Sequence, residues 1–250
     1  MLRHEKDGLA YYSFPILDSQ PRLRHMVLAG HGPGGGSQDL SFDGDGKDRA
    51  LGILKAAGEA LGLPPPAPLG QIHGDRLLAL RKGEENDPSE GERPRQGYDA
   101  VMGWPGQGLM VRLADCQGII LYHPESDTLA LAHSGWRGSA LDIIGKTVKA
   151  MERERGADPK GIIACVSPSI GPCCMEFRDW KSLLPEEAWA FLGEGDHMDF
   201  WAMTAMQLER AGIRKENTEM ARTCTRCDPN FFSHRRGDKG RFGVIAGVLP

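Results

Sequence analysis

The chain has 250 residues, of which 40% are hydrophobic and 26% are charged, and its formal net charge is −4, all ordinary for a soluble globular protein. This slightly acidic balance argues against the basic surface by which nucleic-acid-binding domains are recognised, and no stretch approaches the roughly 18 apolar residues of a membrane helix. Because the first residues also lack the apolar core of a secretion signal, we expect a cytoplasmic protein that binds neither nucleic acids nor membranes and keeps its six cysteines reduced.

The expected elements are helices and short strands. An apolar stripe of helical spacing runs over residues 45–61, and the charged, proline-containing stretch 81–97 is expected to be an exposed loop. A second helix is predicted to begin at Ser139, since Asp142 three residues later completes a capping-box pattern. A third helix is predicted over residues 199–210. Strands are expected at residues 109–113, 118–122, 128–132, 161–166 and 242–248.

The fold class follows from the order of these elements. Helices and strands do not alternate as in a doubly wound sheet, so we expect one α+β domain, a layered sandwich of mixed or antiparallel β-sheets flanked by helices. Strands 118–122 and 128–132 are close enough for a hairpin. A turn centred near residue 125 places Gln117 opposite His133, and a slip of one residue puts Cys116 there. The sequence therefore predicts that Cys116 and His133 meet at the open end of this hairpin.

A cysteine beside a histidine permits three interpretations, which the hairpin geometry leaves open. The pair can be a thiolate nucleophile with its base, two ligands of a metal such as zinc, or a buried structural cysteine next to a hydrogen-bonded histidine. His73 is a further candidate ligand, but its spacing along the chain gives no reason to place it near the hairpin.

Six short motifs narrow these interpretations. They are residues 71–74 (QIHG), 114–116 (ADC), 132–138 (AHSGWRG), 169–174 (SIGPCC), 224–225 (CT) and 231–236 (FFSHRR), the last followed by Gly240-Arg241. Together and in this order they resemble the laccase-domain, or polyphenol-oxidase-like, family of zinc-dependent purine nucleoside phosphorylases. The resemblance covers the chain from about residue 30 to its end, and residues 1–30 match poorly. Leu113 and His234 depart from the family pattern, and these departures bear on substrate preference.

The resemblance implies a metal ion held by His73, Cys116 and His133. Two imidazoles and one thiolate leave zinc a fourth position for water or substrate, which is typical of a catalytic rather than a structural site. Ligation would remove the thiolate from nucleophilic work, so Cys116 is expected to be a ligand. The expected cofactor is one zinc ion, with copper as the alternative.

Charged residues near these motifs are the candidates for catalysis and phosphate binding. Arg137 lies in a glycine-flanked turn just before the expected helix start, where a guanidinium and a helix N-terminus both favour anions, so we expect it to bind phosphate and act in catalysis. Arg236 and Arg241 are expected to bind phosphate as well. Asp115 is the candidate catalytic carboxylate, which would either orient a histidine ligand or carry a proton.

The remaining cysteines give a less specific signal. Cys173 is a candidate substrate-binding residue at the pocket, whereas Cys165 and Cys174 are expected mainly to pack. Cys224 and Cys227 have the spacing of a redox or zinc-knuckle motif, but the sequence has no second such pair. This spacing alone therefore does not predict a second metal.

The resemblance also implies an activity. It points to phosphorolysis of adenosine, inosine, guanosine or methylthioadenosine by phosphate, with adenosine deamination as a second activity, and an open zinc site suits both reactions. A copper-dependent polyphenol oxidase of the laccase type is an alternative, because two histidines and a cysteine also bind copper. A zinc-stabilised binding module without catalysis is a third hypothesis. The chain is expected to be a monomer or a homodimer.

Overall fold

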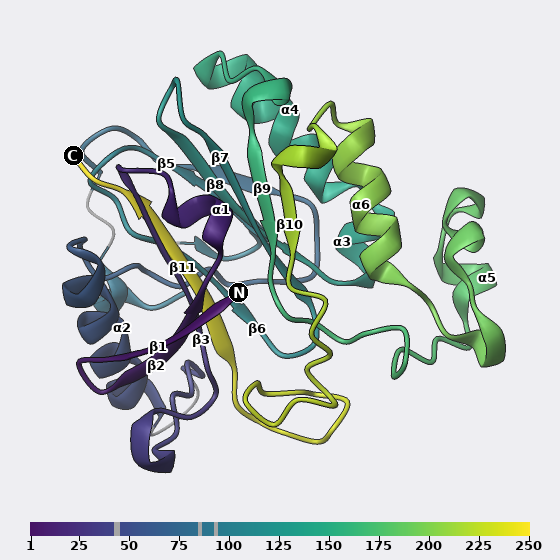
Figure 1. The fold of residues 1–250 in the computed structure, drawn as a ribbon, viewed down its shortest axis with the longest axis horizontal. Coiled ribbons are helices and arrows are strands. Elements are labelled where there is room, and N and C mark those ends of the chain that lie inside the picture. Colours follow the sequence, from purple (N-terminus) through teal and green to yellow (C-terminus); the bar gives the residue numbers. More distant parts are fainter. Residues whose placement is uncertain (43–45, 85–86, 93–94) are drawn as a thin grey trace.

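The computed structural model describes residues 1–42, 46–84, 87–92 and 95–250. Two β-sheets pack face to face, and helices cover the outer face of each sheet, so the fold has four layers (Figure 1). This arrangement confirms the predicted α+β sandwich of mixed and antiparallel sheets.

The first sheet has five strands and is antiparallel throughout. In spatial order its strands are β1 (Leu2–Lys6), β2 (Leu9–Ser13), β3 (Leu23–Leu28), β11 (Phe242–Val248) and β6 (Leu109–Leu113). The helix α2 (Gly46–Leu61) covers the outer face of this sheet. Its Leu54 packs in one apolar cluster with Met26 and Ile245 of the sheet, which explains the helical spacing of its apolar residues.

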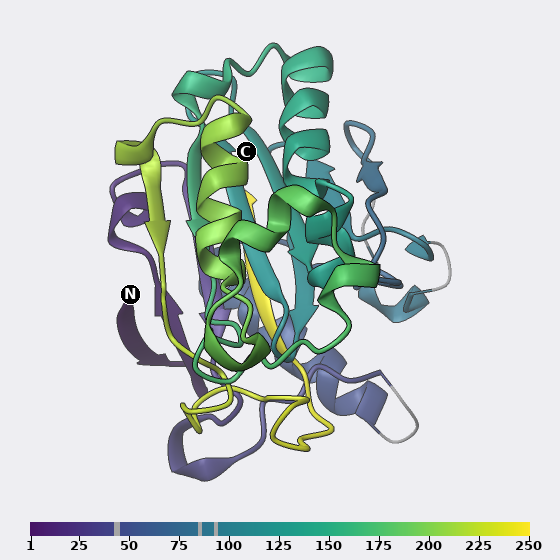
Figure 2. The same ribbon diagram turned by 90° about the vertical axis from the view of Figure 1, so that its right-hand side faces the viewer.

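The second sheet has six strands and is mixed, because its two edge strands run parallel to their neighbours. In spatial order its strands are β10 (Thr218–Met220), β9 (Ile163–Val166), β7 (Gln117–His123), β8 (Thr128–Ser134), β5 (Ala100–Gly103) and β4 (Leu77–Ala79). The helices α4 (Ile143–Arg155) and α6 (Phe200–Arg210) cover its outer face, where Val148 and Leu208 pack with Ile119. Figure 2 shows these two helices in front of the strands.

The central core lies between the two sheets. Side chains alternate along β7, so Ile120 faces this core while Ile119 faces the helices. Every residue of β7 and β8 is consequently buried. Burial on both faces explains why these two strands carry nearly continuous apolar sequence.

The other helices are short and lie in the connections between the strands. They are α1 (Pro15–Asp18), α3 (Trp136–Ala140) and α5 (Trp180–Leu183), with 3-10 turns at Pro33–Gly35, Pro88–Glu90, Pro159–Gly161, Glu186–Phe191, Glu194–Asp196 and Lys215–Asn217. None of the helices within the described ranges is long and apolar enough to cross a membrane.

The second predicted helix starts at the wrong residue. Ser139 lies inside α3, buried, with its hydroxyl oxygen 3.0 Å from that of Ser134 instead of capping a helix. Asp142 is the N-cap of α4, and its carboxylate accepts a hydrogen bond from the backbone N–H of Gly145. Two helices therefore replace the one predicted, because the serine is satisfied elsewhere and the aspartate is free to cap.

The predicted hairpin forms, but its register is shifted by one residue. His123 pairs with Thr128, and Gly118 rather than Gln117 lies opposite His133. The cause is a loop of four residues instead of five, in which Asp127 adopts a positive φ of 49°.

Some predicted positions lie outside the described residues. They are position 45 of the first predicted helix and positions 85–86 and 93–94 of the predicted exposed loop.

Candidate active site

Three side chains from separate parts of the fold converge at one end of β7 and β8. His73 comes from the turn before β4, Cys116 directly precedes β7, and His133 lies in β8. Their ligand atoms all lie within 4.8 Å of one another. The rings of His73 and His133 meet edge to face with centroids 4.9 Å apart. The structure thus brings together the three residues expected to hold a metal, although His73 is far from the other two in sequence.

Two residues with positive φ angles and one closely packed glycine surround this group. His73 and Asp115 both have positive φ angles, 61° and 85°, which are costly for residues other than glycine and cluster at functional sites. Gly135 lies against the same group, because a Cβ atom at this position would be 2.9 Å from Sγ of Cys116. A side chain at position 135 would therefore intrude on Cys116 and His73.

A carboxylate that the motifs did not identify contacts two of the three candidate ligands. Asp99 is wholly buried, and its Oδ1 lies 2.8 Å from Nδ1 of His133. The same carboxylate accepts backbone N–H bonds from His73 at 2.9 Å and Gly74 at 2.7 Å. Asp99 thus orients the ring of one ligand and fixes the turn that carries another. The only signal in the sequence was a charged residue directly before an apolar strand.

The electrostatics of the group favour a thiolate at Cys116 and a protonated ring at His133, which stabilise each other. Burial by itself raises the pKa of the Cys116 thiol, but the charge of His133, and then hydrogen bonds from His133 and His73, outweigh burial and lower the pKa to about 6. Burial alone would lower the pKa of His133, but the facing Cys116 and Asp99 raise it to about 9. The lowered pKa favours the thiolate of Cys116, the form that ligates metals, whereas a metal ion at His133 would have to replace the proton that its raised pKa favours.

Asp115 ties two loops to the site. Its Oδ1 accepts a hydrogen bond from the Thr225 hydroxyl at 2.6 Å, and its Oδ2 accepts one from the backbone N–H of Arg235 at 2.7 Å. Its backbone carbonyl accepts a further bond from the N–H of Ile170. Asp115 was expected either to orient a histidine ligand or to carry a proton. The contact that orients the ring of His133 is made by Asp99 instead.

The group of ligands opens into a pocket of about 500 Å³, a size typical of small-molecule sites. Trp136, Ile170, Met175 and Phe200 give it apolar and aromatic walls. The arginines among its described lining residues are Arg112, Arg235 and Arg241, and Asp115 and His234 also line it.

Of the four residues expected to bind phosphate or substrate, one lines the pocket and the other three have different surroundings. Arg241 lines the pocket. Arg137 is exposed, and its guanidinium carbon lies 4.8 Å from the centroid of the Trp136 ring. Cys173 lies beside other cysteines outside the pocket. Arg236 uses its guanidinium within its own loop, on the carbonyls of Thr225, Arg226, Asp228 and Phe231 and on the carboxylate of Asp238.

Comparison with known proteins confirms the family that the motifs suggested. Residues 39–249 match the model of a family described as multi-copper polyphenol oxidoreductase laccase. The chain is 30% identical to purine nucleoside phosphorylase YlmD of Geobacillus stearothermophilus, over 72% of this chain and 69% of that protein. It is 32% identical to purine nucleoside phosphorylase LACC1 of Mus musculus over 64% of this chain, but spans only 39% of the length of that relative. The crystal structure of YlmD from Geobacillus stearothermophilus superposes with a TM-score of 0.83 at 25% identity, covering 99% of this chain and 98% of that one.

Proposed function

This chain belongs to the family described as multi-copper polyphenol oxidoreductase laccase, and we propose that within it the chain is a zinc-dependent purine nucleoside phosphorylase. One observation carries the proposal: a single pocket combines a His–Cys–His ligand group, arginines for an anion and aromatic walls for a base. The names of relatives at about 30% identity support this activity.

His73, Cys116 and His133 would hold the zinc ion. The donor set fits this metal, and the bond between His133 and Asp99 leaves Nε2 of the imidazole to face an ion. When bound, zinc would act as a Lewis acid that polarises an oxygen of phosphate or water. Zinc is favoured over an oxidase with several coppers, because within the described parts of the chain this is the only such group that combines histidine with cysteine.

The substrates would divide the pocket between them. Arg241 would bind the phosphate, because the guanidinium of Arg112 already contacts Glu92 and that of Arg235 already donates to the carbonyls of Cys174 and Glu176. The rings of Trp136 and Phe200 would hold the purine. A phosphate oxygen would bond to C1′ of the ribose as the bond from C1′ to the base breaks. Positive charge develops on the ribose in this step, so a held phosphate anion both stabilises and attacks it.

Two polar residues of the pocket would serve the leaving base and its surroundings. The base departs with the electron pair and needs a proton, which we assign to His234 of the pocket lining. Asp115 would instead position the segment that carries Thr225 and Arg235, since each of its oxygens already accepts a hydrogen bond.

A nucleoside panel tests this function. Zinc-loaded protein is incubated with adenosine, inosine, guanosine or methylthioadenosine, with and without phosphate, and free base and ammonia are both measured. Phosphate-dependent release of base is expected, whereas ammonia from adenosine would reveal deamination at the same site. His133→Ala should abolish both the zinc bound at the pocket and the turnover, while His197→Ala, at a half-buried histidine outside the pocket, should retain both.

Two results would contradict the proposal. One is the absence of turnover with all four nucleosides by fully zinc-loaded protein. The other is near-stoichiometric copper in the purified protein together with oxygen uptake on phenols, which would favour the polyphenol oxidase.

A further inference from the structure

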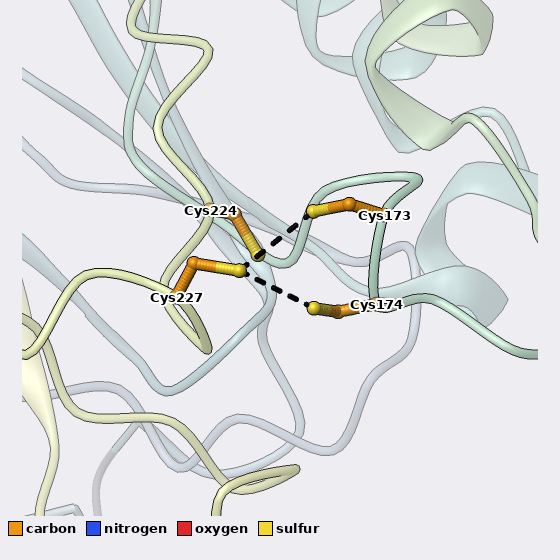
Figure 3. Close-up of side chains that lie close together, drawn as sticks. All are labelled: Cys173, Cys174, Cys224 and Cys227. Carbon is orange, nitrogen blue, oxygen red and sulfur yellow. Dashed lines mark hydrogen bonds between the residues drawn. The ribbon is translucent and has the colours of Figure 1, made fainter.

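A second group of ligand atoms lies outside the pocket and has no part in the proposed reaction. Cys173 and Cys174 lie in the turn that follows β9, and Cys224 and Cys227 lie in the long segment between β10 and β11. Figure 3 shows the four side chains pointing toward one another from these two segments. Their four sulfur atoms all lie within 4.8 Å of one another.

The spacing of the sulfurs suits one tetrahedral ion. Zinc–sulfur bonds of about 2.3 Å in a tetrahedron separate neighbouring sulfurs by about 3.8 Å. Sγ of Cys227 lies 3.5 Å from Sγ of Cys174 and 3.9 Å from Sγ of Cys173. A disulfide would require about 2.05 Å. The sulfurs are therefore gathered around a common centre and are not bonded in pairs.

Polar donors also point at this cluster. The backbone N–H of Gly171 donates to Sγ of Cys224 at 3.3 Å, and the guanidinium of Arg226 donates to Sγ of Cys174 at 3.5 Å. Hydrogen bonds of this kind stabilise the thiolate form, which is the form that ligates a metal. Two donors and four sulfurs thus meet at one point between two loops.

We propose that Cys173, Cys174, Cys224 and Cys227 bind one zinc ion, distinct from the ion proposed for the pocket. Four cysteine ligands would fill every position of a tetrahedral zinc, so this site is structural and takes no substrate.

The two joined segments form part of the pocket wall. Ile170 and Met175, on either side of the cysteine pair, line the pocket. Thr225, next to Cys224, donates to the carboxylate of Asp115 in that lining. Arg235, also of the lining, donates to the backbone carbonyl of Cys174. A zinc ion at the cysteines therefore cross-links the segment after β9 to the segment between β10 and β11, and so stabilises this wall of the pocket.

Zinc content of the full-length protein, reconstituted under reducing conditions and freed of excess metal, tests the proposal. The unmodified protein should hold two zinc ions per chain. Cys227→Ser and Cys116→Ser should each hold one, because each loses a different site. Cys165→Ala removes a buried strand cysteine outside both groups and should keep two.

A second measurement covers the case in which a variant fails to fold. Native mass spectrometry of the unmodified protein should show two zinc ions, and iodoacetamide should alkylate the four cysteines only after a chelator is added. One zinc per chain that is lost in Cys116→Ser but kept in Cys227→Ser, or a chain 2 mass units lighter because two of the cysteines form a disulfide, would overturn the proposal. So would two zinc ions in folded Cys227→Ser. None of these results depends on nucleoside turnover, so the two proposals fail separately.

Discussion

Oδ1 of Asp99 lies 2.8 Å from Nδ1 of His133, and the aspartate is wholly buried behind this ring. The contact fixes which imidazole nitrogen faces the other ligands. It also extends to His73, whose backbone N–H donates to the same Oδ1. One buried carboxylate therefore sets the geometry of two candidate metal ligands, one in β8 and one in the turn before β4.

Asp99→Asn should weaken zinc binding at the pocket by about 10- to 100-fold, the usual effect of losing a partner of a ligand. The amide would also turn an N–H donor toward backbone N–H groups, such as those of His73 and Gly74, that now donate to the carboxylate. A competition titration with a chromophoric chelator measures the affinity. Asp75→Asn is the matched control, because Asp75 pairs with Lys146 on the surface. Equal affinities in Asp99→Asn and the unmodified protein would contradict this role.

Gly135→Ala should lower zinc affinity by steric means alone. The backbone at Gly135, with φ −86° and ψ −176°, is open to any residue, but the new Cβ would lie 2.9 Å from Sγ of Cys116. The thiolate must move to make room. Gly52→Ala is the control, since a Cβ there meets nothing within 4 Å, and alanine should stabilise α2 by roughly 1 kcal/mol. The same titration applies, and unchanged affinity in Gly135→Ala would show that the ligands can shift freely.

Arg241→Met should change phosphate binding, whereas Arg236→Met should change stability. Arg241 lines the pocket, so its loss should raise the KM for phosphate by about 10- to 100-fold, the equivalent of 1.5–3 kcal/mol for a hydrogen bond to a charged group. Arg236 is bonded within its own loop, so its loss should lower the melting temperature and change the phosphate KM little. Steady-state kinetics and thermal unfolding distinguish them. A large rise in KM for Arg236→Met would reverse the assignment.

Stability should fall as the pH drops from 6.5 toward 4 because of His25. Burial lowers the pKa of this histidine to about 4, and its Nε2 accepts the backbone N–H of Phe14 at 2.8 Å. In this pH window His25 is protonated in the unfolded chain but neutral in the folded chain, so the free energy of unfolding declines as pH falls. The loss between pH 7 and pH 4.5 should be about 2 kcal/mol, at 1.36 kcal/mol per pKa unit.

Urea unfolding at pH 7 and pH 4.5 measures this loss. His25→Gln removes the titrating group, so its free energy of unfolding should depend less on pH across the same window. An identical decline in both proteins would assign the effect to other residues.

Local sequence was sufficient for much of the fold. The helices α2 and α6, the strands β6 and β11, and the meeting of Cys116 with His133 all follow from apolar spacing and short turns. These features depend on contacts between residues close in sequence. The order of the motifs likewise identified the family.

Contacts over long sequence separations decided the rest. His73 reaches the hairpin, and Asp99 reaches behind His133, only because β4 and β5 pack beside β8. The spacing of Cys224 and Cys227 did not predict a metal, because their partners lie in another loop, about 50 residues earlier in the chain. Periodicity and turn chemistry act over a few residues, whereas the ligand groups are assembled by the stacking of two sheets and the loops that cross their ends. The sequence therefore determined most of the elements, the family and the meeting of Cys116 with His133. Only the tertiary structure decided that Asp99 lies behind His133 and that the four cysteines form one group.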